Sequence, residues 1–256
     1  MKKFFKTFIR PIIRKCGVDI VQYKGISKLN YPPDFSNKNV LICNSVMQYT
    51  MTSPERVNAL IEAVRYIVTN KIDGAMVECG VWKGGSTMAM ALALKEMGDE
   101  TRDIYLYDTF SGMSTPTDVD ISIYGTNAQS KFSKTKISDD ASDWCLSSLE
   151  EVKKNVMSTG YPEQKLHFIK GKVENTIPGK IPKEIALLRL DTDWYESTKH
   201  ELIHLFPRLK PRGVIIIDDY GHWEGARKAV DEYIFENHLC LLLNRIDHTG
   251  HIAIKT

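Results

Sequence analysis

Four aspartates follow directly after two short apolar runs, at residues 186–190 and 214–217. They are Asp191, Asp193, Asp218 and Asp219. Carboxylates are hard oxygen ligands of the kind that Mg²⁺ binds in proteins. The adjacent pair stands at the end of a buried apolar run, where two like charges need a cation or another partner to offset their repulsion. We therefore predict a divalent-metal site whose ligands are one aspartate after the first run and the pair Asp218 and Asp219 after the second.

A less specific interpretation exists for each acid taken singly. A lone aspartate after a strand is more often a helix N-cap than a metal ligand, and Asp193 would then cap a helix that begins near Glu196. That interpretation does not account for the adjacent pair Asp218 and Asp219, so we favour the metal site.

The segment between the two apolar runs has the pattern of a helix. Its apolar residues fall on one face, and Pro207, Pro211 and Gly213 end it. A strand, a helix and a second strand of these lengths form a parallel βαβ unit, so the carboxyl ends of both strands point the same way. Ligands of open α/β sheets bind at that edge, and the topology therefore brings the four acids together.

A second pattern of strand, turn and helix begins at residue 75, where a short apolar run leads into a glycine-rich turn. Glycines let the backbone approach a ligand, and the helix start offers free N–H groups, so the pattern suits a nucleotide-like cofactor. The spacing GxxxGGS is neither GxGxxG nor GxxxxGK[ST], which argues against NAD and against a P-loop. Asp108 ends the next strand and is placed to bind ribose hydroxyls. A plain tight turn is the alternative, but together the two features predict adenosine binding.

The other segments have clearer structural than functional signals. Residues 111–140 are polar and aperiodic, so we predict a mobile cover over the site. The turn after a short strand at 166–169 would bring Val173 to the same ligand-binding edge. The remaining predicted elements are helices at 53–70, 142–159 and 224–237 and two closing strands at 239–243 and 251–254.

Length and composition are those of an ordinary soluble globular protein. The 256 residues suffice for one large α/β domain, and 43% of them are hydrophobic. The net charge of +2 comes from interspersed basic and acidic residues, which argues against nucleic-acid binding. No apolar run approaches the length of a transmembrane span. The five cysteines are scattered and form no CxxC motif, so we expect a reducing, cytoplasmic location.

Residues 1–50 form an N-terminal extension in our prediction, followed by one domain at 51–256. Residues 2–15 mix lysines and arginines with phenylalanines and isoleucines, as a basic amphipathic helix does. Such a helix can make peripheral contact with a membrane surface. Packing against the domain, as a lid, or against a second subunit is the interpretation that we favour. Charges interrupt the apolar stretch, so it is not a signal peptide, and residues 24–40 then have the composition of a polar linker.

Six stretches of the sequence resemble the TylF/MycF family of macrocin-type O-methyltransferases. They are VECGVWKGGSTMA, LYDTFSGM, STGYP, GKVENTIP, LLRLDTDWYESTKHEL and IDDYGHWEGARKAVDEY. The resemblance implies an α/β, Rossmann-like class I methyltransferase fold with a mostly parallel seven-stranded sheet, helices on both faces and a C-terminal antiparallel strand. It also implies that S-adenosylmethionine and a divalent metal, usually Mg²⁺, are used to methylate a sugar hydroxyl, and that the protein is a homo-oligomer.

Carried over position by position, the resemblance assigns the site residues. The cofactor-binding residues are Glu78, Gly80, Ser86, Asp108, Val173 and Glu174. The metal ligands that it implies are Asp191, Asp218 and Asp219, which makes Asp191 the ligand from the first run. In the more distant catechol O-methyltransferase type, a lysine shortly after the first metal aspartate acts as the base. Here that stretch is Asp193-Trp194-Tyr195, so another group must take the proton.

Methyl transfer from a sulfonium is an in-line displacement that requires a nucleophilic oxygen. An aspartate with a pKa of about 3.9 faces a hydroxyl at about 15.7, so a carboxylate alone is too weak a base. A divalent ion that binds the sugar oxygen reduces this gap and fixes the hydroxyl. Our hypothesis is that Asp191 both ligates the metal and accepts or relays the proton. Asp193 and His222 are the other candidates, although His222 also has a purely structural interpretation.

The acceptor in the main prediction is a sugar hydroxyl of a glycoside, a nucleotide sugar or a glycan. Two other functions remain compatible with the sequence. A catechol or other phenol also offers adjacent oxygens to the metal and is more acidic, at a pKa of about 10. The other alternative is a non-catalytic S-adenosylmethionine-binding partner in glycan assembly. The predicted metal ligands speak against it, since a scaffold has no need of mutually repelling charges.

Overall fold

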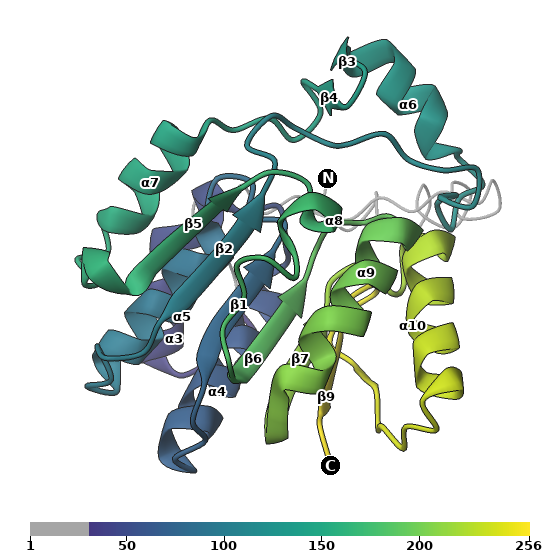
Figure 1. Cartoon of the computed structure of the whole chain (residues 1–256). Coiled ribbons are helices and arrows are strands. Elements are labelled where there is room, and N and C mark those ends of the chain that lie inside the picture. Colours follow the sequence, from purple (N-terminus) through teal and green to yellow (C-terminus); the bar gives the residue numbers. More distant parts are fainter. Residues whose placement is uncertain (1–30) are drawn as a thin grey trace, which may run out of the picture. The chain divides into compact units, whose positions relative to one another are not determined.

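The structure, a computed structural model, describes residues 31–256. The predicted amphipathic helix at 2–15 lies outside them. Residues 35–256 form one compact unit built on a seven-stranded sheet with helices on both faces (Figure 1). None of the described helices is long and apolar enough to cross a lipid bilayer.

The strands of the main sheet run in the order β5-β2-β1-β6-β7-β9-β8. Their bounds are β1 (Ala75–Cys79), β2 (Ile104–Asp108), β5 (Leu166–Lys170), β6 (Ile185–Leu190), β7 (Leu209–Ile217), β8 (Asn244–Arg245) and β9 (His251–Ile254). The first five strands in this order are parallel, and β9 and β8 are antiparallel to their neighbours. The predicted Rossmann-like class, with its mostly parallel seven-stranded sheet, is therefore confirmed.

Two groups of helices cover the sheet, as Figure 1 shows. On one face lie α3 (Asn37–Val46), α4 (Pro54–Thr69) and α5 (Gly85–Glu96), and on the other lie α8 (Val173–Thr176), α9 (Tyr195–Leu205) and α10 (Glu224–Glu236). Helix α7 (Leu149–Met157) packs against α5. Because both faces are covered, the central strands are apolar almost throughout, and every residue of β1 and β6 is buried.

The compact unit starts earlier than the predicted domain boundary at residue 51. Helix α3 and the 3₁₀ helix η2 (Met47–Tyr49) belong to it, and α3 packs against α4 and α5. The Ser36 side chain caps α3 by accepting the Asn39 N–H. The linker predicted at 24–40 therefore overlaps the first turn of α3, which begins with the polar residues Asn37 and Lys38.

Two predicted elements differ from the observed ones. The helix predicted at 142–159 begins at Leu149, because β4 (Ala141–Ser142) pairs with β3 (Lys136–Ser138) just before it. The strand predicted at 239–243 does not form. Leu239, Leu241 and Leu243 pack against the core from a loop, and the short β8 pairs with β9 instead. An apolar run satisfies the pattern of a strand even where the chain buries its side chains without pairing.

Residues 111–144, called the cover segment below, cross above the carboxyl ends of the strands (Figure 1). The segment contains α6 (Ala128–Thr135), β3 and β4. An isolated bridge between Ser122 and Trp223 joins it to the loop after β7. The cover predicted at 111–140 therefore has secondary structure of its own and lies over the expected ligand-binding edge.

Candidate active site

The acids follow neighbouring parallel strands and therefore meet at one edge of the sheet. Leu190 at the end of β6 pairs with Ile217 at the end of β7. The residue after each strand continues the pairing. The Asp191 N–H donates to the Cys79 carbonyl at 2.8 Å, and the Asp218 N–H donates to the Leu190 carbonyl at 2.9 Å. The backbone thus places the acids side by side, as the strand pattern predicts.

Three of the four acids form a tight cluster. One carboxylate oxygen from each of Asp191, Asp193 and Asp219 lies within 4.8 Å of the others, and all three residues are partly buried. This spacing and the all-oxygen donor set suit a divalent cation such as Mg²⁺. The predicted set of ligands had Asp218 in place of Asp193.

Asp218 points away from this cluster into an ion-pair network. Its Oδ1 accepts a hydrogen bond from Arg189 at 2.5 Å, its Oδ2 accepts one from Arg56, and only 6% of the residue is exposed. Successive residues at the end of a strand point to opposite faces of the sheet, which separates Asp218 from Asp219. Asp218 lines the same cavity as Asp191 and Asp219, but two arginines already offset its charge.

Arg189 in β6 is the central cation of this network. It is 3% exposed, and its guanidinium donates to Glu78 at 2.8 Å and to Asp191 at 2.7 Å as well as to Asp218. The sequence-based prediction missed both Arg189 and Arg56. A signal was present for Arg189, because an arginine within the apolar run ALLRLD has to find carboxylate partners when it is buried.

Carboxylates outnumber cations at this edge of the sheet. The acids around Arg56 and Arg189 are Glu78, Asp191, Asp193, Asp218, Asp219 and Asp247. Burial raises the pKa of Asp191 and of Asp219 well above the usual range, and repulsion from neighbouring acids adds to the rise. The attraction of Arg189 opposes the rise at Asp191. Burial likewise raises the pKa of Asp193 to about 7. The cluster therefore lacks positive charge of the kind that a bound cation supplies.

Asp193 is held in a strained turn. Its φ is 70°, in the left-handed region, and the Trp194 N–H donates to the Thr192 carbonyl across it at 2.8 Å. This is a γ-turn with positive φ, the rarer and more strained of the two forms. Strain of this kind is concentrated at functional sites. The N-cap residue of α9 is Trp194, so the alternative role of Asp193 as a helix cap is not observed.

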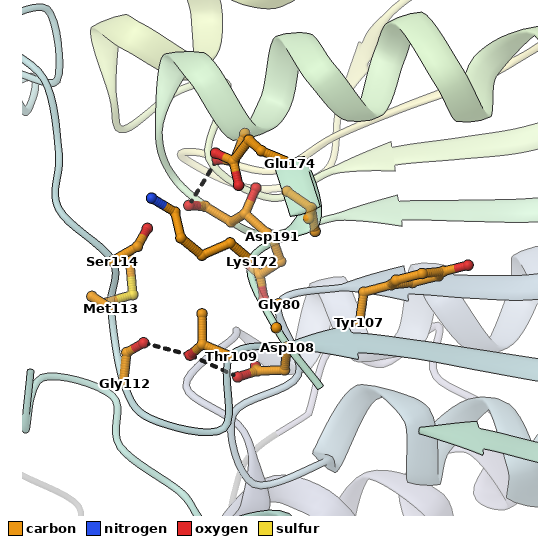
Figure 2. A pocket seen from close by; sticks show the side chains of 14 residues that line it. Gly80, Tyr107, Asp108, Thr109, Gly112, Met113, Ser114, Lys172, Glu174 and Asp191 are labelled. Atoms are coloured by element: carbon orange, nitrogen blue, oxygen red, sulfur yellow. Dashed lines mark hydrogen bonds between the residues drawn. The ribbon is translucent and has the colours of Figure 1, made fainter. Parts of the chain in front are cut away.

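A small pocket opens at the ends of β1, β2, β5 and β6 (Figure 2). Four of the predicted cofactor-binding residues line it, namely Gly80, Asp108, Val173 and Glu174. Gly80 has a φ of 82°, and a Cβ there would lie 2.0 Å from the Asp191 carbonyl oxygen. Only glycine lets the two loops approach this closely. The position at the sheet edge suits a nucleotide-like ligand.

The Asp108 carboxylate is held by backbone N–H groups of the loops around it. Its Oδ2 accepts from Val81 at 2.7 Å and from Trp82 at 3.1 Å, and its Oδ1 accepts from Phe110 at 2.7 Å. Burial raises the pKa of Asp108, and these hydrogen bonds oppose that rise. Asp108 therefore fixes the glycine-rich loop to the end of β2 as well as bordering the pocket.

A large cavity of about 550 Å³ also borders Asp191. Its lining combines the acid cluster with polar and aromatic side chains, several of them from the cover segment. The aromatic residues are Tyr49, Trp82, Tyr124, Trp144, His222 and Trp223. Glu78 and Ser86, which were predicted to bind the cofactor, line this cavity and not the small pocket. Asp191 is the residue that lines both spaces.

His222 and Trp223 form part of the wall of the large cavity, and Trp194 packs against Trp223. The rings of Trp194 and Trp223 lie 5.1 Å apart in an edge-to-face arrangement, and His222 packs against Trp223 at 4.8 Å. Burial lowers the pKa of His222, so its ring is neutral near pH 7. The third candidate for the base therefore shares a cavity with the acids, in a form that can accept a proton.

Comparison with known proteins agrees with this geometry. The model of the macrocin-O-methyltransferase (TylF) family matches residues 32–254. An 8-demethyl-8-(2,3-dimethoxy-alpha-L-rhamnosyl)-tetracenomycin-C 4'-O-methyltransferase from Streptomyces olivaceus is 31% identical over 202 residues, which cover 79% of this chain and 74% of the relative. A mycinamicin III 3''-O-methyltransferase from Micromonospora griseorubida is 30% identical over 79% of this chain and 76% of the relative.

Solved structures are similar as well. The O-methyltransferase NovP matches with a TM-score of 0.71 and 27% identity, over 81% of this chain and 82% of NovP. A calicheamicin methyltransferase matches with a TM-score of 0.58 over 93% of this chain and 99% of its own. Its sequence identity of 16% makes that second match a similarity of fold alone.

Proposed function

This chain belongs to the macrocin-O-methyltransferase (TylF) family of S-adenosylmethionine-dependent enzymes, and we propose that it methylates a sugar hydroxyl of a glycoside with the help of a divalent cation. The observation that carries the proposal is the position of Asp191, which lines both the small pocket and the large cavity. A transferase needs its donor and acceptor sites to meet at the reacting group. The Streptomyces olivaceus relative is named for a rhamnosyl compound, which favours a glycoside over a nucleotide sugar or a glycan.

The small pocket is our proposed site for S-adenosylmethionine. Its walls come from loops after four parallel strands. Gly80 has no side chain and lies close to Asp191, so backbone atoms form part of the pocket surface. Val173, Glu174 and Asp108 would hold the adenosine part, as the family resemblance implies. The sulfonium of the bound cofactor supplies the methyl group.

The large cavity is our proposed acceptor site. A sugar presents apolar C–H faces and polar hydroxyl edges, so a cavity that combines indole rings with carboxylates suits it. Trp144 and Trp223 line one part of the cavity, and the acid cluster lines another. The volume of about 550 Å³ is more than a single catechol ring fills and leaves room for a sugar with an attached group, which favours a glycoside over a catechol.

Asp191 and Asp219, with Asp193 beside them, are our proposed holders of the divalent cation. Their oxygens have the required spacing, and the surplus of carboxylates gives the site the charge to attract a cation. A bound Mg²⁺ lowers the pKa of a hydroxyl that ligates it and fixes that hydroxyl in place. Asp218 keeps a different role in this proposal, as the partner of Arg56 and Arg189.

Asp193 is our proposed acceptor of the hydroxyl proton. Asp191 was the first prediction, but the Arg189 guanidinium already donates to one of its oxygens at 2.7 Å, so that oxygen is not free to take up the proton. Asp193 lies in the same cluster and lines the large cavity. As the O–C bond forms and the C–S bond breaks, the proton passes from the sugar hydroxyl to the Asp193 carboxylate. The products are a methyl ether and S-adenosylhomocysteine.

The test is methyl transfer from labelled S-adenosylmethionine to matched panels of glycosides, nucleotide sugars and catechols, each with and without EDTA. We expect glycosides to be methylated, EDTA to abolish the transfer and added Mg²⁺ to restore it. Transfer to catechols alone would contradict the acceptor class. Transfer that proceeds equally well in EDTA would contradict the metal, whichever acceptor is used.

A further inference from the structure

The cover segment is hydrogen-bonded to both loops that carry the acids. On the side of β6, the indole N–H of Trp194 donates to the Ser114 carbonyl at 3.0 Å. On the side of β7, the Ile123 N–H donates to the His222 carbonyl at 2.9 Å, and the Glu224 N–H donates to the Ile121 carbonyl at 2.8 Å. The cover segment therefore assembles together with the loops that position Asp193 and Asp219.

Asp120 is the charged residue at the centre of this attachment. It is fully buried, with 0% of its surface exposed. Its Oδ1 accepts the backbone N–H of Tyr195 at 2.9 Å. Its Oδ2 accepts the N–H and the hydroxyl of Thr117, at 2.7 and 2.8 Å. No step of the proposed reaction uses this carboxylate, and a buried acid needs a reason to be there.

Tyr195 is the first residue of α9, and the helix has no cap of its own. Trp194 occupies the N-cap position and its side chain makes no capping bond. The first N–H groups of a helix lack partners within it, and the helix dipole favours a negative charge near them. Asp120 supplies that acceptor and that charge from a segment far away in the sequence.

The position of Asp120 is tight on its other side as well. A Cβ added to Gly225, near the start of α10, would lie 2.0 Å from Oδ1 of Asp120. The absence of a side chain at Gly225 lets the carboxylate sit between the first turns of α9 and α10. These two helices begin directly after the loops that carry Asp193 and Asp219.

We infer that Asp120 is a positioning residue for the acid cluster. Tyr195 lies two positions after Asp193, whose γ-turn is strained and needs its surroundings to hold it. Asp120 fixes the helix end that follows this turn, and it does so only when the cover segment is in place. Formation of the cover segment is thereby coupled to the cation-binding geometry. The inference rests on the proposed function of the same site.

The test compares Asp120→Ala and Asp120→Asn with Asp118→Ala, which removes an exposed acid two positions away in the same segment. Isothermal titration with Mg²⁺ alone, on protein saturated with S-adenosylhomocysteine, measures the cation affinity. We expect Asp120→Ala to weaken Mg²⁺ binding by about 10-fold to 100-fold, as loss of a group that orients metal ligands does. Asp120→Asn keeps one acceptor oxygen and should lie between it and the wild type, and Asp118→Ala should equal the wild type.

Hydrogen exchange of the full chain provides a second readout that does not depend on the metal. In Asp120→Ala, exchange should rise in the peptide that contains residues 191–195 as well as in the cover segment. A folded Asp120→Ala protein with wild-type Mg²⁺ affinity, or with faster exchange in the cover segment alone, overturns the inference. A wild-type protein that binds no Mg²⁺ contradicts the proposed metal site instead, and the exchange experiment then decides the role of Asp120 by itself.

Discussion

The four aspartates at the sheet edge have different partners, and their substitutions should therefore have different effects. Asp193 lies in the cluster without a role in the buried ion pairs, whereas Asp191 is bound by Arg189. Asp193→Asn keeps the shape of the side chain and removes the proton acceptor. We expect kcat to fall by at least about 100-fold, the usual contribution of a general base, with the affinity for S-adenosylhomocysteine nearly unchanged.

Steady-state rates and titration with S-adenosylhomocysteine measure these two quantities. Asp191→Asn should abolish turnover as well, because that residue holds the cation and borders both spaces. Turnover retained in Asp193→Asn but lost in His222→Asn would move the role of base to His222.

Asp218 and Asp219 are adjacent in sequence and offer a matched pair of variants. Asp219→Asn removes a proposed cation ligand, so Mg²⁺ affinity should fall by about 10-fold or more while the thermal stability changes little. Asp218→Asn breaks a buried contact to two arginines, and loss of one member of such a pair costs about 3–5 kcal/mol of folding free energy.

Calorimetric titration and thermal unfolding of both variants separate the two roles. Should Asp218→Asn remain fully stable and lose Mg²⁺ binding, the originally predicted ligand set would be right and the observed cluster would not be the cation site.

At the scale of elements, α4 is joined to the turn before β9 through its first residues. The Ser53 hydroxyl and the Arg56 guanidinium both donate to Oδ2 of Asp247, at 2.6 and 2.8 Å. Burial alone would raise the pKa of Asp247, but bonds from Ser53, Gly250, Thr249 and Arg56 hold it well below its ordinary value. The helix start and the C-terminal strand are thereby held together by one ionised carboxylate.

This contact predicts a pH dependence of stability with a definite sign. A carboxylate whose pKa is depressed by folding stabilises the native state above its unfolded pKa of about 4, and the contribution is lost as the pH falls below that value. Asp247→Asn should therefore be less stable than the wild type by about 2 kcal/mol at pH 7, and the difference should shrink towards pH 3. Urea unfolding of both proteins from pH 3 to 7 measures it. A difference that stays constant across this range would contradict the depressed pKa.

At the scale of the whole molecule, ligand binding should stabilise the fold in two separable steps. A ligand at about 100 times its Kd adds about 2.7 kcal/mol of stability. S-adenosylhomocysteine should raise the Tm of the wild type and of an Asp191→Asn, Asp219→Asn double variant alike. Mg²⁺ should raise the Tm of the wild type alone, because it offsets repulsion among carboxylates that the double variant lacks. An equal Mg²⁺ effect in both proteins would place the cation elsewhere.

The homo-oligomer implied by the family resemblance stays a prediction. Light scattering of the purified protein should give a mass that is a multiple of the 29.2 kDa chain. A monomer at all concentrations would contradict it, and would leave the site of residues 35–256 complete within one chain.

The sequence by itself determined the architecture of the site. Apolar runs that end in acid predicted two parallel strands with their carboxyl ends at one edge, and the glycine-rich loop predicted the pocket beside them. These are local signals, because a buried parallel strand must be apolar along its length and polar where it ends. The same signals placed Gly80, Asp108 and Asp191 at the ligand-binding edge.

Only the tertiary structure decided which acids act together. The alternation of side chains at the end of β7 separates Asp218 from Asp219, and the partners of Asp218 come from β6 and α4. The buried Glu78 accepts a hydrogen bond from Arg189, and its side chain does not line the small pocket. The cap of α9 comes from Asp120 in the cover segment. Each of these outcomes depends on contacts between residues distant in the chain, and spacing along one segment carries no information about them.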